Sequence, residues 1–388
     1  MLNLSATARG ALLLSALLAA SAPALAFQDP TEVPAARSER MLTSPMTAVT
    51  SVGTKTIAVG QRGHIAISED NGQSWRQAQV PVSSDLVAVS FPSETHGWAV
   101  GHGGVVLHSA DGGETWQKQL DGQEAIGLVK NFYSPSGPGG REVEEAAMYH
   151  EREEILVSYG GTQALMAVHF LNEREGFVGG LFNRLFHTTD GGATWQPWQH
   201  RIDNPMELHF YGITADDEAV YITGEMGMVW RMRHGEEHFV ERPTGYDGTL
   251  FGSISNGRSL VAFGMRGSVY RSPDAGDSWT RVDLGTNAGI TSGAVLPGGV
   301  MLLGALSGEV VRSGDGGRSF QSLQLDRSMP YFGLAARADG QLTLVGAAGV
   351  QQEALAVDVK TDTDKSAVVK NAGTSMIKQW GSSYGYTN

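Results

Sequence analysis

Short apolar runs separated by glycine turns recur along most of this chain. In the clearest unit, residues 97–101 are followed by a glycine turn at 102–104, a second apolar run at 105–108 and the polar segment 109–116. A further apolar run at residues 86–91 precedes the unit. This order predicts a first strand at residues 86–91, then two strands joined by a glycine turn. A tight hairpin leads from them to a fourth strand, which begins at an aromatic residue.

The polar hairpin segment is repeated at a nearly constant spacing. Its aspartates lie 41 residues apart from Asp70 to Asp111 and again from Asp274 to Asp315, and 84 residues apart from Asp190 to Asp274. The longer interval equals two units, of which the one between keeps its apolar runs and loses the hairpin at residues 232–239. A unit of about 40 residues with four strands is typical of a propeller blade.

These units predict an all-β fold, a seven-bladed β-propeller of four-stranded antiparallel blades over residues 46–357. The seventh unit begins at residues 331–335 and 342–346 and then fades. Either the N-terminal segment 27–45, through a strand near Val33, or Ser366–Lys370 completes that blade. We favour the N-terminal segment, because chain ends that meet would close the ring. The polar tail 358–388 matches no blade.

The hairpin segment has a local structural explanation. Its aspartate can accept hydrogen bonds from the backbone of its own turn, and its glycines supply positive φ angles at little steric cost. The aromatic residue that follows buries a large face against the neighbouring sheet. We therefore assign a structural role to the aspartate and the aromatic residue of each copy: Asp70, Trp75, Asp111, Trp116, Asp190, Trp195, Asp274, Trp279, Asp315 and Phe320.

The pattern Ser/Thr-x-Asp-x-Gly-x-Thr/Ser-Trp resembles the Asp-box, or bacterial neuraminidase repeat, of sialidases and many non-enzymes. The longer phrase Gly-Trp-Ala-Val-Gly-x-x-Gly at residues 97–104, followed by a strand and the hairpin, resembles the photosystem II stability/assembly factor family. The similarity covers about residues 46–350. It implies a non-enzymatic protein that holds a newly made membrane subunit.

The first 26 residues resemble a secretory signal peptide. Arg9 precedes the apolar run 11–18, and Ala24-Leu25-Ala26 offers a small-x-small cleavage site. We therefore expect export to the periplasm, and no later apolar run is long enough to span a bilayer. The chain has no cysteine, so no disulfide can support the exported fold.

The chain carries a formal net charge of −13, and loss of Arg9 with the signal peptide would make it −14. Such a surface repels nucleic acid, so we expect a protein partner instead, a membrane protein complex of the envelope.

Residues 119–163 interrupt the repeat between the second and third units. Pro135–Gly140 is predicted to be a flexible loop, and Arg141–Tyr159 contains helix formers with ion pairs at i,i+4 spacing. His150 lies among glutamates but lacks the two-histidine spacing of helical zinc sites, which favours a solvated charged face. We interpret the insert as a lid or docking arm.

Function is expected at the glycine turns between the second and third strands of the blades, because these turns project to one face of a propeller. The acidic pairs Asp216-Asp217 and Glu236-Glu237 are adjacent in sequence, whereas glycoside hydrolysis needs carboxylates facing each other across a cleft. We therefore expect no catalytic residue, cofactor or metal, and keep a glycan-binding or sialidase-like glycan-cleaving protein as the alternative. The candidate binding residues of the turns are Arg62, His102, Asn183, Arg184, Glu225 and Arg266.

Overall fold

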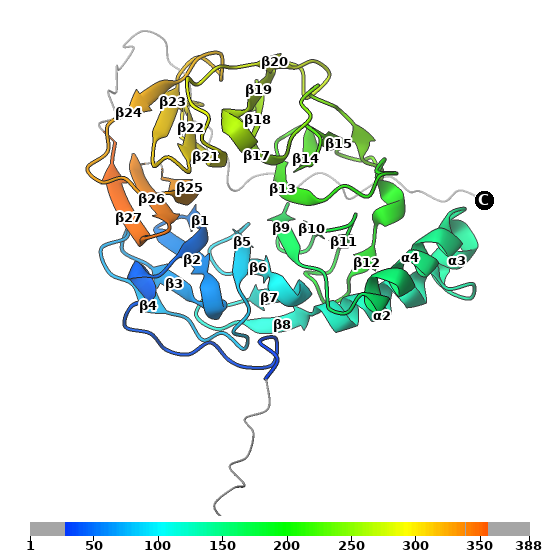
Figure 1. Ribbon diagram of the computed structural model, residues 1–388. Helices are drawn as coiled ribbons and strands as arrows, with labels where there is room; N and C mark the ends of the chain where they lie inside the picture. The colour runs from blue at the N-terminus through cyan, green and yellow to red at the C-terminus, as the bar shows by residue number, and fades with distance from the viewer. Residues whose placement is uncertain (1–27, 338, 356–388) are drawn as a thin grey trace, which may run out of the picture. The chain divides into compact units, whose positions relative to one another are not determined.

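Seven antiparallel sheets surround a common axis in the computed structural model, which describes residues 28–337 and 339–355 (Figure 1). Six sheets have four strands each, and the described part of the seventh has three. The predicted seven-bladed β-propeller is thus confirmed. The predicted signal peptide and the polar tail lie outside the described residues.

Each blade is formed by consecutive strands, so that every pairing is between neighbours in sequence. The strands of blades one to seven are β1 (Met46–Val52), β2 (Lys55–Gly60), β3 (Ile65–Ser68), β4 (Arg76–Gln77); β5 (Leu86–Ser90), β6 (Gly97–Gly101), β7 (Val106–Ser109), β8 (Gln117–Leu120); β9 (Leu165–Phe170), β10 (Gly176–Gly180), β11 (Leu185–Thr188), β12 (Gln196–Pro197); β13 (Phe210–Ala215), β14 (Ala219–Gly224), β15 (Val229–Arg233), β16 (Val240–Glu241); β17 (Leu250–Ser255), β18 (Leu260–Gly264), β19 (Val269–Ser272), β20 (Thr280–Arg281); β21 (Ile290–Val295), β22 (Met301–Ala305), β23 (Val310–Ser313), β24 (Gln321–Leu323); β25 (Tyr331–Ala336), β26 (Gln341–Gly346), β27 (Gly349–Ala354).

The second strand of each blade supplies much of the core. These seven strands are almost entirely buried, since both of their faces pack against neighbouring sheets. They are β2, β6, β10, β14, β18, β22 and β26. That arrangement explains why they are mostly apolar and why even their threonines, Thr56, Thr223 and Thr343, are fully buried.

All seven first strands contain a β-bulge at their second residue, where the register against the second strand shifts by one residue. A bulge re-aims a side chain and increases the local twist. The hydroxyl of Thr291 donates to the carbonyl of Tyr331 in the next blade at 2.6 Å, which links adjacent blades. The seven bulged residues are Thr47, Val87, Met166, Tyr211, Phe251, Thr291 and Phe332.

The ring closes between blades seven and one by side-chain packing. Met46 and Val345 belong to one buried cluster there. A guanidinium nitrogen of Arg337 also donates to the carbonyl of Gly53 at 3.2 Å. In the described part of the chain, the first strands of these two blades, β25 and β1, therefore lie against each other, and no strand passes from one blade to the other.

The N-terminal segment does not pair with β27, contrary to our expectation. The Ala35 N–H donates to the Val80 carbonyl at 3.1 Å, and the Ser38 N–H donates to the Gln77 side chain at 2.9 Å. Residues 28–40 thus lie against blades one and two, and no strand forms near Val33. The segment is rich in proline and polar residues, which favours extended chain over a sheet edge. The other candidate, Ser366–Lys370, lies outside the described residues.

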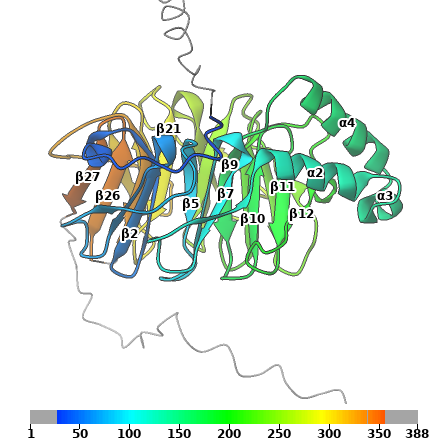
Figure 2. The same cartoon turned by 90° about the horizontal axis from the view of Figure 1, so that it is seen from below.

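The insert is helical over most of its length, with α2 (Gly122–Tyr133), α3 (Pro138–Glu142) and α4 (Ala146–Ser158) beside the ring (Figures 1 and 2). The sequence analysis missed α2, although Asp121 and Glu124 form a capping box at its start. The first three residues of α3, Pro138–Gly140, were also predicted to be loop, whereas Arg141 and Glu142 fell in the segment predicted to form a helix. Apolar side chains of α2, including Val129 and Tyr133, enter the core between blades two and three. The insert is therefore part of the folded unit.

Candidate functional site

The loops of the propeller lie on two opposite faces. We call the turn face the one that carries the turns between second and third strands and the connections between blades. The two kinds of loop are bonded there, as when the Arg62 N–H donates to the Asp85 side chain at 2.8 Å. The hairpin face carries the remaining loops, and the Gly112 N–H donates there to the Thr95 carbonyl at 2.8 Å.

The hairpins of the hairpin face are stabilised by hydrogen bonds to their aspartates. One carboxylate oxygen of Asp111 accepts the Ser109 hydroxyl at 2.8 Å and the Thr115 N–H at 3.0 Å, and the other accepts the Thr115 hydroxyl at 2.5 Å. The indole N–H of Trp116 donates to the Gly113 carbonyl at 2.8 Å. The same acceptor pattern occurs at Asp70, Asp190, Asp274 and Asp315.

These bonds stabilise the ionised carboxylates. At Asp70, the Ser74 hydroxyl and then the Ser74 N–H lower the pKa from its ordinary value to about 2. At Asp111, partial burial acts to raise the pKa, but the bonds from Thr115 and Ser109 outweigh it and the net shift is downward. Hydrogen bonding to the charged form is the physical cause in both hairpins.

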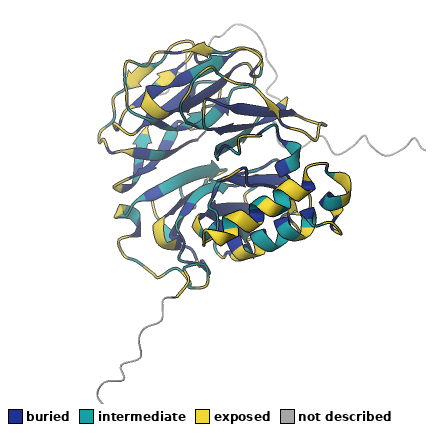
Figure 3. Ribbon diagram, turned by 45° about the vertical axis from the view of Figure 1, so that its right-hand side comes forward, coloured by how far each residue is buried: buried dark blue, intermediate teal, exposed yellow. Residues whose placement is uncertain are grey.

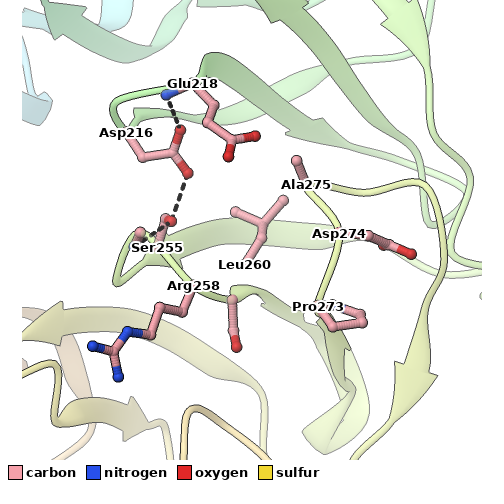
Figure 4. Close-up of a pocket in the computed structure, with 10 residues that line it drawn as sticks. Asp216, Glu218, Ser255, Arg258, Leu260, Pro273, Asp274 and Ala275 are labelled. Carbon is pink, nitrogen blue, oxygen red and sulfur yellow. Dashed lines mark hydrogen bonds between the residues drawn. The ribbon is translucent and has the colours of Figure 1, made fainter.

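A small pocket of about 70 Å³ on the hairpin face is lined by Asp216, Glu218 and Asp274, of which Asp216 and Glu218 lie side by side and Asp274 points away from them (Figure 4). One oxygen of Asp216 accepts the N–H groups of Glu218 and Ala219 at 2.9 and 3.1 Å, and the other accepts the Ser255 hydroxyl at 2.6 Å. Asp274, also in the lining, serves its own hairpin. Two of the pocket's three carboxylates thus organise turns. Within the described residues, no group of three metal-ligating side chains gathers anywhere.

The six predicted binding residues of the turn face do not form one site. Arg62, His102 and Arg266 lie exposed at the tips of separate turns. Glu225 accepts the His209 N–H at 2.9 Å and so stabilises the connection into the fourth blade.

Asn183 and Arg184 are buried, which corrects their prediction as surface binding residues. A guanidinium nitrogen of Arg184 lies 3.0 Å from a carboxylate oxygen of Glu153 in α4, and their side chains are only 4% and 3% exposed. Asn183 accepts the Asn204 side-chain amide at 3.0 Å. Since the insert supplies the partner of Arg184 from 31 positions away, the turn itself gave no sign of this burial.

Exposed apolar side chains occur on the turn face in four successive blades. Met226 is 49% exposed at the tip of its turn, and Met206, in the connection between blades three and four, is 60% exposed. Their neighbours come from the corresponding turns of blades three, five and six, so that four successive blades contribute. We call this set the apolar arc: Phe182, Met206, Met226, Met265 and Leu306.

These turns were predicted to carry the site, but none of the six candidate binding residues is one of the apolar residues of the arc. The sequence signal that could have identified them is a difference between blades in the residue at the first turn position. Gln61 and His102 occupy the first turn position in blades one and two, whereas Met265 and Leu306 occupy it in blades five and six. Large apolar residues at solvated turn tips are the informative exception.

Two members of the arc have unfavourable backbone conformations. Phe182 and Met226 have φ angles of 54° and 52°, in the left-handed region, and Gly103 has a φ of 75° in the turn of blade two. A residue with a Cβ atom costs about 1–2 kcal/mol in this region, and glycine does not. Such strain occurs most often at functional sites.

Among residues 28–337 and 339–355, no segment covers the turns of blades four to six in the way that the N-terminal segment covers those of blades one and two. Residues 30–36 pack on the turns of blades one and two, where a side chain at Gly63 or Gly103 would meet Ala35 or Thr31. The turns of blades four to six have no such covering segment among the described residues, and Figure 3 shows exposed residues at the loops between buried strands.

The arc is continuous with aromatic side chains at the start of blades four and five. Phe182 contacts His209 edge to face with ring centroids 4.6 Å apart, and the bulged residues Tyr211 and Phe251 pack edge to face at 6.0 Å. Burial, and then the carboxylate of Glu225, raises the pKa of Tyr211, so its phenol stays neutral at ordinary pH. This part of the turn face therefore offers apolar contact beside the charged groups of Glu225 and Arg266.

The fold and these loops define a class of protein. It is a seven-bladed β-propeller with one face that hydrogen bonds stabilise within its hairpins and one apolar, partly open face. The family model of the Photosynthesis system II assembly factor YCF48 matches residues 51–133 and 148–280, more than half of the chain. The chain belongs to this family, and the resemblance stated from the sequence is confirmed.

Two relatives match shorter parts of the chain. The photosystem II stability/assembly factor HCF136 of Cyanidioschyzon merolae is 44% identical over 48 residues, 12% of this chain and 11% of that protein. The photosystem II assembly protein Ycf48 of a Synechococcus strain is 24% identical over 141 residues, 34% of this chain and 41% of that protein. The chain thus spans less than half the length of each of these relatives.

Solved structures show the same fold at low sequence identity. YCF48 bound to D1 peptide superposes with a TM-score of 0.58 and 16% identity, over 83% of this chain and 99% of the other. YCF48 from Cyanidioschyzon merolae gives the same score and identity over 80% and 95%. A streptogramin B lyase gives 0.59 at 14% identity over 80% and 93%, so the fold is also used by an enzyme.

Proposed function

We propose that this protein is an exported, non-enzymatic docking factor that holds a subunit of an envelope membrane protein complex during assembly. It binds the subunit through the apolar arc. Membership of the assembly factor family supports the general role. That YCF48 has been solved with a D1 peptide supports a peptide segment of a membrane protein as the kind of ligand.

The observation that carries this proposal is the apolar arc on the turns of blades three to six. Methionine side chains adapt to irregular apolar partners, and Phe182 offers a rigid aromatic contact. Backbone strain at Phe182 and Met226 holds large side chains where glycine would be more stable. An unassembled membrane subunit exposes apolar segments that need such a surface.

Export is supported by the n-region, apolar run and cleavage pattern of the first 26 residues. In the described residues, no helix is long and apolar enough to cross a membrane. The protein would then work at the outer side of the membrane that holds its partner.

The absence of chemistry is part of the proposal. It is supported by the use of the five hairpin aspartates as acceptors within their own turns, and of Asp216 as an acceptor within its turn and from Ser255 of the next blade. A panel of fluorogenic sialosides and polysaccharides tests it directly. Turnover that depends on folded protein would refute the non-enzymatic role and favour the glycan-cleaving alternative.

Docking is tested by placing a photo-cross-linking residue at Met226 or Met265, with Glu173 on the hairpin face as the control position. We expect adducts with one membrane protein subunit from the first two positions and not from the third. Equal adducts from both faces, or adducts from Glu173 alone, would contradict docking through the arc.

A further inference from the structure

A groove of about 570 Å³ lies between α4 and the connection from blade three to blade four. We call it the α4 groove. Glu145, Met148 and Tyr149 line it on the helical side, and Ile202, Asp203 and Pro205 line it on the side of the connection. This volume lies within the range of 300–1,000 Å³ that is common for ligand sites.

Both walls of the α4 groove are fixed by contacts outside its opening. The carboxylate of Glu207 pairs with the Arg152 guanidinium, and the Tyr149 hydroxyl donates to the Gln199 carbonyl at 3.2 Å. The buried pair of Glu153 and Arg184 anchors the same helix. The groove is therefore present before any ligand binds.

The apolar part of the groove is partly exposed. Met148 is 44% exposed at the helical wall, whereas Ile202 is buried at the base of the opposite wall. Pro205 is followed directly by Met206 of the apolar arc. The α4 groove thus continues the apolar surface of the turn face toward the rim.

The charged groups that line the groove are mostly negative and uncompensated. Glu145 and Glu241 have no ion-pair partner within the described residues, and Asp203 pairs only with His238, at 2.7 Å. Arg152 is already occupied by Glu207. Burial, followed by the neighbouring charge of Arg201, lowers the pKa of His200 to about 4, so this ring is neutral at ordinary pH.

The family match covers most of the residues that line the groove but leaves out one of its acidic residues. The family match stops at residue 133 and resumes at residue 148, so Glu145 lies in a part of the insert that the match leaves out.

We propose that the α4 groove binds a basic segment of a protein partner, with an apolar side chain packed against Met148 and lysine or arginine beside Glu145 and Glu241. Negative charge without internal partners is complementary to such a segment, and electrostatic complementarity favours both selectivity and fast association. The inference rests on the proposed function only in that the ligand is a segment of a protein.

The test measures binding of two fluorescein-labelled peptides by fluorescence anisotropy. One is rich in lysine and leucine, and its twin has glutamate in place of every lysine. We expect the lysine peptide to bind at least about tenfold more tightly than its twin, with an affinity that falls as salt is raised from about 0.15 M to about 1 M.

The variant E145Q/E241Q should weaken binding of the lysine peptide about threefold to tenfold, because exposed charge pairs contribute modestly. Added to these changes, Met148→Ala should weaken binding of the lysine peptide further, because it removes apolar contact. The matched control E173Q/D217N removes the same charge from the hairpin face and should leave binding unchanged. All these positions are exposed, so the variants are expected to fold.

Equal affinity for the two peptides would overturn the proposal, as would equal losses in E145Q/E241Q and in the control. Loss of binding in Met226→Ser without loss in the groove variants would also overturn it and leave the proposed function standing. Conversely, selective binding of the lysine peptide together with no adducts from Met226 would support the groove and reject docking through the arc.

Discussion

The hairpin face and the turn face of this propeller are made from the same repeating units but use their loops differently. On the hairpin face, Asp111 accepts three hydrogen bonds within one turn, and the Trp116 that follows is buried. On the turn face, Met226 is half exposed in a left-handed conformation. The hairpin face satisfies the carboxylates of its aspartates within their own turns, whereas the turn face exposes apolar side chains at its turns.

The difference indicates where stability and binding are located. Loops that satisfy their own polar groups stabilise the blades and leave little to offer a ligand. Loops whose side chains remain uncovered contribute little to folding, but they can gain contacts when a partner covers them. Variants of the two faces should therefore separate stability from binding.

The largest change in stability is expected at the buried ion pair between Arg184, in a turn of the turn face, and Glu153, in helix α4 of the insert. Glu153→Ala should lower the free energy of unfolding by about 3–5 kcal/mol, because it leaves the Arg184 charge buried without a partner. Denaturant unfolding measures this change. Glu154→Ala, which removes an exposed partner of Lys130, is the control and should change stability by less than about 0.5 kcal/mol.

The next effect is expected on the hairpin face. Asp111→Ala should lower the free energy of unfolding by about 1–2 kcal/mol through loss of its hydrogen bonds, without changing partner capture. Asp217→Ala, an exposed acid on the same face, should stay within about 0.5 kcal/mol of the parent. Lost capture at unchanged stability would place a binding role on this face and break the comparison.

The hairpin aspartates should also make stability depend on pH in acid. The pKa of Asp70 is about 2 in the folded chain and about 3.9 when unfolded, so the folded form favours the ionised group. Its contribution is fully present above about pH 4 and is lost as pH falls through 2. Unfolding measured from pH 5 to pH 2 should show a stability difference between parent and Asp70→Asn that shrinks as pH falls. A constant difference over this range contradicts the assignment.

The smallest change in stability is expected at the apolar arc. Met226→Gly should leave the free energy of unfolding unchanged or raise it by up to about 1 kcal/mol, since glycine removes the left-handed strain. The same variant should reduce cross-linking from Met265. Arg62→Gly is the matched control, because Arg62 has a φ of 56° in blade one and lies outside the arc. If both variants reduce cross-linking equally, the arc has no special role.

Much of the fold could be predicted because its signals are local. The spacing from Asp70 to Asp111 gave the size of a blade, and the apolar runs gave its strands. The signal for helix α2 is equally local, since Asp121 and Glu124 form a capping box at its start. This helix does not belong to the repeating unit and was not predicted. The N-terminal segment was misplaced because ring closure was assumed to need a shared strand.

The candidate site was less predictable, because it depends on what covers each turn. Phe182 and Asn183 are adjacent in sequence, yet Phe182 is exposed and Asn183 is buried against Asn204. No feature of the turn itself separates them.

By itself, the sequence determined the repeating unit, the hairpins and the turn positions, because these depend on contacts within about 40 residues. Only the tertiary structure decided that Arg184 pairs with Glu153, that residues 30–36 cover the turns of blades one and two, and that the apolar arc stays open. Those outcomes depend on packing between units, which a local pattern of residues does not encode.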